Sequence, residues 1–198
     1  MPYPLYVLIG SNIWTSMVGT MSSVSGGLNN QADLIMRTNI PKIVLAISSI
    51  ASVVYGIIIS MVTLGIVFLF YNIWPSPWFL LYPLLVAPLL IIGLALGLFL
   101  SILSSFAKDI TNIVTQIFAL IAFITPIYYL PESIESPIIQ KIIQYNPFSY
   151  MIDIPRSLVF NGYANNLELY LLITGGFIAL FMIGLRFFYL IDDLVAER

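Results

Sequence analysis

Long apolar runs are the feature that most constrains how this chain can fold. The clearest one extends from Ile43 to Tyr71 without a charged residue, and about 20 apolar residues suffice for a helix to cross the hydrocarbon core of a bilayer. Such a segment must satisfy its own backbone hydrogen bonds, which a helix does internally. Of all residues, 60% are hydrophobic and 8% are charged. The sequence therefore predicts an all-α, polytopic membrane protein, with residues 1–198 forming a single transmembrane domain.

Five segments are apolar enough to be interpreted as transmembrane helices. Polar or proline-containing stretches separate them, such as residues 72–78 with two prolines and two tryptophans, a composition typical of the membrane interface. The first span is the most polar, and its small residues favour contact with other helices over contact with lipid. The predicted spans are residues 5–24, 43–71, 79–103, 113–129 and 167–190.

A short polar segment, residues 29–42, separates the first two spans. Asp33 and Arg37 lie four residues apart, Leu34 and Ile35 are apolar, and Pro41 disfavours helix at the residue before it. This pattern predicts a small amphipathic helix lying on the membrane surface. The alternative is a solvated, basic loop that only sets the topology.

Residues 131–166 contain four prolines that divide them into short pieces. Pro137 and Pro147 are favourable first helical residues, and Gly162 is a favourable residue just beyond a helix end. Neither piece is long enough to cross a bilayer. We therefore expect an outer helical hairpin, made of a pair of interfacial or re-entrant helices.

The second helix of this hairpin carries Asp153 and Arg156, three residues apart. Irregular backbone at membrane depth is tolerated only where it is buried in protein or lines a wet cavity. One hypothesis is that the hairpin forms the outer gate of a transport path, with these two residues paired. The alternative is a surface loop with an exposed ion pair that contributes about 0–1 kcal/mol.

Basic residues indicate the orientation in the membrane. With residues 29–42 in the cytoplasm, that side holds five basic residues and the opposite side holds Lys141 and Arg156. The excess favours an outer hairpin and a cytoplasmic C-terminus in a multi-pass protein of the cytoplasmic membrane. The five are Arg37, Lys42, Lys108, Arg186 and Arg198.

Missing residue types exclude several functions. The chain has no cysteine and no histidine, which removes thiol catalysis and the usual transition-metal ligands, so no catalytic or metal site is predicted. The acidic pair Asp192-Asp193 lies in the tail and is interpreted as a solvated end. The net charge of −2 gives no indication of nucleic-acid binding. A scaffold or non-functional fragment remains a further alternative.

The residues and motifs that the sequence lacks also indicate the source of energy for transport. The first four predicted spans contain no ionisable Asp, Glu, Lys or Arg, whereas ion-coupled carriers generally need such a group in the membrane. A sodium site made only of carbonyl and hydroxyl oxygens is the alternative. The chain also lacks a P-loop sequence for binding nucleotide. A transporter of this kind takes its energy from a partner protein, and the cytoplasmic helix at residues 29–42 is the natural contact.

Aromatic residues are candidates for lining a transport path, because the faces of a cargo can stack on aromatic rings. Tyr55 lies in the middle of a span and Trp14 lies among small polar residues, whereas Tyr128 and Tyr129 end the fourth span. Packing in the protein interior is an equally good interpretation of these four residues. The candidate path and gate residues are Trp14, Tyr55, Tyr128, Tyr129, Asp153 and Arg156.

Four stretches, in this order along the chain, resemble the permease subunits of polysaccharide-exporting ABC transporters. The first has Asn30, then Leu34-Ile35, a basic Arg37, and Pro41-Lys42. The others are Lys108-Asp109-Ile110, Thr125-Pro126-Ile127-Tyr128-Tyr129, and Asn146-Pro147-Phe148 with Arg156 downstream. Each match is weak alone, but together they are fairly specific, because they occur in the family's order and are spread over nearly the whole chain.

This resemblance implies a homodimer with two ABC ATPase subunits, which bind ATP and Mg while this chain binds no cofactor. It implies export of a lipid-linked glycan of the polysaccharide, teichoic-acid or O-antigen type. Family members carry an interfacial helix and one more span before Leu5, so the chain looks short at its N-terminus. The related drug-export branch is the second candidate. We expect the ATPase to contact Asn30, Asp33, Leu34, Ile35, Arg37, Pro41 and Lys42.

Overall fold

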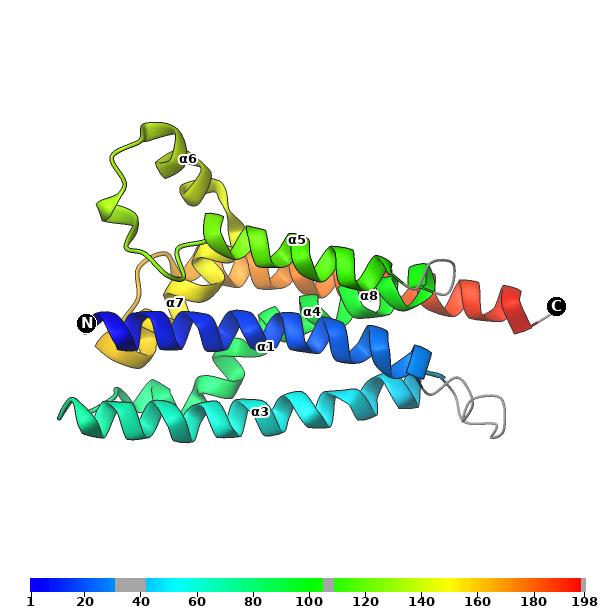
Figure 1. Ribbon diagram of the computed structural model, residues 1–198, viewed down its shortest axis with the longest axis horizontal. Helices are drawn as coiled ribbons and strands as arrows, with labels where there is room; N and C mark the ends of the chain where they lie inside the picture. Colours follow the sequence, from blue (N-terminus) through cyan, green and yellow to red (C-terminus); the bar gives the residue numbers. More distant parts are fainter. Residues whose placement is uncertain (31–41, 105–108, 197–198) are drawn as a thin grey trace.

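The computed structural model describes residues 1–30, 42–104 and 109–196, and all regular secondary structure in these ranges is helical. Figure 1 shows long helices that run side by side, with a smaller helical hairpin at one end. The prediction of an all-α protein is confirmed. The elements are α1 (Tyr3–Asn30), α3 (Lys42–Phe70), η1 (Pro77–Leu81), α4 (Tyr82–Ser104), α5 (Ile110–Ile124), η2 (Pro131–Ser133), α6 (Pro137–Tyr145), α7 (Pro147–Asn161) and α8 (Leu167–Ala196).

Helix α1 lies at the centre of the bundle and packs against α3, α4, α5 and α7. Its fully buried residues recur every four positions, as one face of a helix requires: Leu5, Ile9, Ile13, Met17 and Met21 are each 0% exposed. Apolar side chains on this face therefore build the core, and the polar Thr20 and Ser25 are buried with them.

Two glycines of α4 allow α1 to approach closely. A methyl group added at Gly93 would lie 2.6 Å from the carbonyl oxygen of Met17, and one at Gly97 would lie 2.8 Å from that of Met21. These glycines are four residues apart, the small-residue spacing that lets two membrane helices bring their backbones together. At these two glycines the backbone of α4 therefore packs directly against the backbone of α1.

Helix α5 is attached to α1 by hydroxyl groups. Ser25 and Thr111 share a hydrogen bond of 2.7 Å, and Ser22 and Thr115 lie 3.5 Å apart. Interhelical hydrogen bonds of this kind hold helices together in a membrane, where apolar side chains alone provide no preference for protein over lipid.

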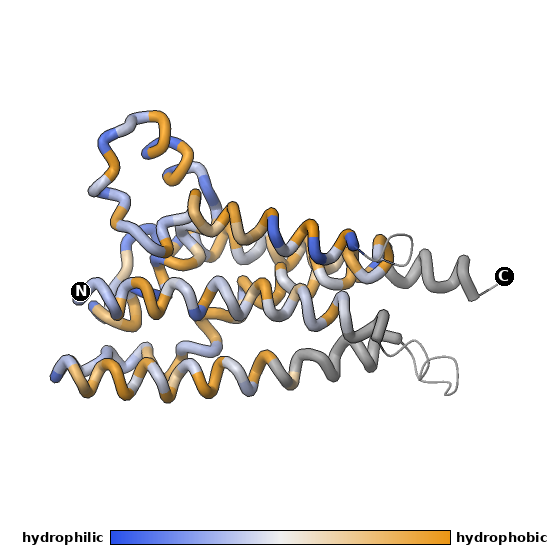
Figure 2. The backbone as a smooth tube through the Cα atoms, viewed as in Figure 1, coloured by the Kyte–Doolittle hydropathy of each residue, from blue (hydrophilic) through white to orange (hydrophobic). Residues whose placement is uncertain are grey.

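Three helical stretches are long and apolar enough to cross a membrane, namely Val53–Phe70, Pro77–Ser104 and Leu167–Arg186, among the residues that the structure describes. Helix α1 is long but more hydrophilic than α3 (Figure 2). The finding supports a membrane protein, whereas the count of five spans stays a prediction.

The predicted fourth span, residues 113–129, differs from the observed helix. Helix α5 begins earlier and ends at Ile124, after 15 residues, which corresponds to about 22 Å at 1.5 Å per residue. Thr125 is extended, as expected for a residue that precedes a proline. Residues 125–130 therefore leave the helix and become available to other parts of the structure.

The outer hairpin has the predicted helix boundaries. Helices α6 and α7 begin at Pro137 and Pro147, and Gly162 follows α7 in the left-handed conformation with a φ of 82°. Both helices lie at the end of the molecule where α1 begins, whereas α4 ends and α5 begins at the opposite end (Figure 1). That the hairpin re-enters the membrane stays a prediction.

Candidate functional site at the outer end of the bundle

The side chain of Arg156 is the largest fully buried side chain in the described residues, with 1% of its surface exposed. It extends from α7 toward α1, and its guanidinium carbon lies 3.6 Å from the centre of the Tyr6 ring. Stacking on an aromatic face stabilises a cation that has been removed from water. The site thus begins with one charge held between two helices.

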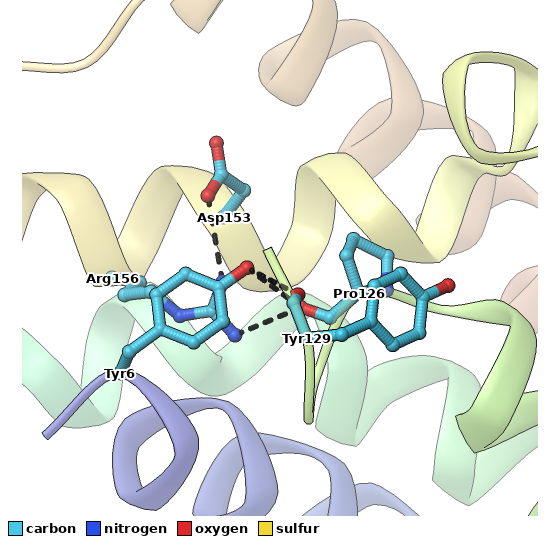
Figure 3. Close-up of polar contacts among 5 residues, drawn as sticks. All are labelled: Tyr6, Pro126, Tyr129, Asp153 and Arg156. Atoms are coloured by element: carbon cyan, nitrogen blue, oxygen red, sulfur yellow. Dashed lines mark hydrogen bonds and ion pairs between the residues drawn. The ribbon is translucent and has the colours of Figure 1, made fainter. Parts of the chain in front are cut away.

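Residues 125–130 supply the oxygens that surround this charge (Figure 3). Arg156 Nη2 donates a hydrogen bond of 3.2 Å to the carbonyl of Pro126. The Tyr6 hydroxyl lies 3.1 Å from the same carbonyl and 3.2 Å from that of Tyr129. Because this segment is not helical, its carbonyls are free to accept these bonds, so the early end of α5 has a structural role.

Asn146 attaches the start of α7 to the same segment. Its Oδ1 accepts a hydrogen bond of 3.0 Å from the Phe148 backbone N–H, which caps the helix, while its Nδ2 donates one of 3.0 Å to Thr125 Oγ1. Two of the four stretches that carry the family resemblance, Thr125–Tyr129 and Asn146–Phe148 with Arg156 downstream, therefore meet at one place in the fold.

Asp153 and Arg156 form the expected pair, with Oδ1 and Nη1 separated by 3.5 Å. Their surroundings differ strongly, since the Asp153 side chain is 58% exposed and that of Arg156 is 2% exposed. The alternative of a surface loop with an exposed ion pair does not fit this burial. Arg156 Nε and Nη1 make no hydrogen bond, so the guanidinium is only partly satisfied.

Gly10 belongs to this site and was not among the residues that the sequence indicated. A methyl group at this position would overlap Arg156 Nη2, so a larger residue would require the guanidinium to shift from its place between α1 and α7. Tyr6 was also missed. Both lie four residues apart on the buried face of α1, and only the position of α7 distinguishes them from ordinary packing residues.

The aromatic candidates fall in different places. Trp14 is 3% exposed and its ring centre lies 5.5 Å from that of Phe148 and 6.1 Å from that of Phe118. It also lines, with Tyr128, a cavity of about 750 Å³ between α1 and α5. Tyr55 lies on α3 and is 66% exposed. It belongs neither to the aromatic cluster around Trp14 nor to the wall of this cavity. The structure therefore brings Trp14 and Tyr128 together and leaves Tyr55 apart.

Two of the seven residues predicted to contact the ATPase lie within the described residues. Asn30 ends α1 and Lys42 begins α3. Asp33, Leu34, Ile35, Arg37 and Pro41 lie outside the described residues. Within the described ranges, no group of three acidic side chains is placed to hold a metal ion.

Known proteins resemble this chain at the level of family and of individual relatives. A family model described as ABC-2 type transporter matches residues 2–160. The O-antigen export system permease protein RfbA of Myxococcus xanthus is 23% identical over 133 residues, 67% of this chain and 51% of that protein. The RfbA of Klebsiella pneumoniae is 28% identical over 189 residues, 94% of this chain and 71% of that protein. The chain thus spans about half the length of the first relative.

Proposed function

This chain belongs to the ABC-2 type transporter family of membrane proteins, and from that premise we propose that it is the transmembrane subunit of an ATP-driven exporter. The proposed cargo is a lipid-linked polysaccharide or polyol-phosphate polymer that crosses the cytoplasmic membrane. The family match over residues 2–160 carries this proposal, and the two relatives named as O-antigen export permeases support the choice of cargo.

The proposed assembly contains two copies of this chain and two ABC ATPase subunits, which bind the ATP and Mg. Residues 29–42 form the contact with the ATPase in this proposal, and the C-terminus lies on the same, cytoplasmic side. The absence of a P-loop sequence and of ionisable residues in the first four predicted spans supports an external energy source. The polymer passes between the two protomers.

The outer hairpin acts as the exit gate in this proposal. Its second helix, α7, is linked to α1 through Arg156 and Tyr6 and to residues 125–130 through the Pro126 carbonyl. A movement of α1 would therefore be transmitted to the hairpin through these contacts. This linkage supports a gate better than a passive surface connection.

Loss of the gene in its host is expected to remove the exported polymer from the cell surface and to leave lipid-linked polymer inside. The wild-type chain should restore export and should co-purify with the ATPase. A double substitution, Leu34→Asp with Ile35→Asp, should abolish both while membrane insertion is retained, since losing apolar anchors at an interface costs about 2 kcal/mol or more. Unchanged surface polymer in the deletion strain would refute the proposed function.

A further inference from the structure

A second feature of the outer hairpin is an open cavity of about 380 Å³, lined by α6, α7 and the segment that precedes them. Its size falls in the range of about 300–1,000 Å³ that is typical of small-molecule sites. It lies beside the Arg156 site and shares Pro126 and Asp153 with it. The gate function proposed above does not use this space.

Ser149 lines the cavity from α7 with a buried hydroxyl group. The residue is 7% exposed, and its Oγ makes no hydrogen bond in the structure. A buried hydroxyl without a partner costs free energy that a hydrogen bond from a ligand would recover.

The remaining polar groups of the wall suit a ligand with many hydroxyls. Glu132 and Asp153 contribute carboxylates that accept hydrogen bonds, while the amides of Gln140 and Gln144 both donate and accept. Tyr150 adds an aromatic ring beside these groups. Carboxylates, amides and an aromatic surface together can bind the hydroxyls and the apolar face of a sugar ring.

The same wall is unfavourable for a phosphate. None of the residues that line the cavity is basic, and two are acidic. Asp153 is paired with Arg156, so a phosphodiester would meet the carboxylate of Glu132 and no cation among the lining residues. Lys141 lies on α6 but lines a different hollow, beside Ile142 and Tyr145. The charge of this cavity therefore distinguishes between the two kinds of polymer left open above.

We propose that this cavity binds a neutral, hydroxyl-rich saccharide unit of the exported polymer as it leaves the membrane. The inference rests on the proposed export function and narrows its cargo to a polysaccharide, as opposed to a polyol-phosphate polymer. Ser149, Gln144 and the carboxylate of Glu132 provide the hydrogen bonds, and the ring of Tyr150 provides the stacking surface.

Photo-crosslinking in exporting cells tests this site with the host's own polymer as the probe. A benzoylphenylalanine introduced at Gln144 should capture glycan several-fold more efficiently than one introduced at Lys141. Both residues are exposed on α6, three positions apart, and only Gln144 lines the cavity. Gln140, which is also exposed and also lines it, provides a second position for the crosslinker.

A serine pair on α7 provides the matched control for the ligand contact. With the crosslinker at Gln144, Ser149→Ala should lower capture several-fold, whereas Ser157→Ala should leave it unchanged, because Ser157 does not line the cavity. Captured material should contain neutral sugars and no phosphodiester backbone. Capture of a polyol phosphate, or equal capture at Gln144, Gln140 and Lys141, would overturn the inference while continued export leaves the proposed function standing. Surface polymer that persists after deletion of the gene would overturn both.

Discussion

Arg156 and Asp153 are paired by distance, yet only the arginine is buried. Removing Arg156 loses its charged hydrogen bond to the Pro126 carbonyl, which contributes about 1.5–3 kcal/mol, and its buried stack on the Tyr6 ring, which contributes about 2 kcal/mol. The exposed Asp153 carboxylate contributes about 1 kcal/mol or less. We therefore expect Arg156→Ala to abolish export and Asp153→Asn to retain most of it. Exchanging the two residues should not restore export, because it would bury a carboxylate against the Tyr6 ring. Surface polymer, normalised to the amount of protein in the membrane, measures each effect.

Two glycine variants on α1 test the same contact, with Gly10→Ala as the test and Gly19→Ala as its matched control. Gly10→Ala should displace the guanidinium and reproduce part of the Arg156→Ala defect, whereas a methyl group at Gly19 would contact nothing within 4 Å. Full export by the Gly10→Ala variant would show that the position of Arg156 is unimportant. Restoration of export by the Asp153–Arg156 exchange would instead support a simple ion pair.

Contact between α1 and α4 depends on glycines, so larger residues there should disturb the packing of whole helices. Gly97→Leu would force a side chain against the Met21 carbonyl and Val24, whose Cβ would lie 2.8 Å from an added methyl group. We expect the free energy of unfolding to fall by about 1–3 kcal/mol, which would lower the midpoint of thermal unfolding in detergent. The control is Gly65→Leu on α3, where an added methyl group meets nothing within 4 Å. Equal midpoints for the two variants would contradict this account of the interface.

The two ends of the whole molecule should face opposite sides of the membrane. The natural chain has no cysteine, so a single introduced cysteine gives an unambiguous labelling signal. An impermeant thiol reagent should reach a cysteine at Ser133 only from outside, and a cysteine at Thr38 only from the cytoplasm, because basic residues favour the cytoplasmic side. Labelling of both positions from one side would refute the proposed orientation, and membrane vesicles of both orientations provide the control.

Local chemistry determined where most helices begin and end. Prolines start α6 and α7, Asn146 caps α7, and Gly162 ends it, because each of these residues restricts or permits backbone angles at its own position. Hydrophobic length likewise indicated a membrane protein before any contact was known. The earlier end of α5 was also readable in principle, since Thr125 precedes a proline.

Only the tertiary structure decided which of these residues form a site. The sequence placed Arg156 three residues from Asp153. Its burial against Tyr6 and its hydrogen bond to Pro126 join it to segments 150 and 30 residues away along the chain, respectively. The same holds for Trp14, which is buried, and Tyr55, which is exposed, although both lie in predicted spans. Burial depends on which helix faces lie against one another, and that choice is made by close packing between distant parts of the chain.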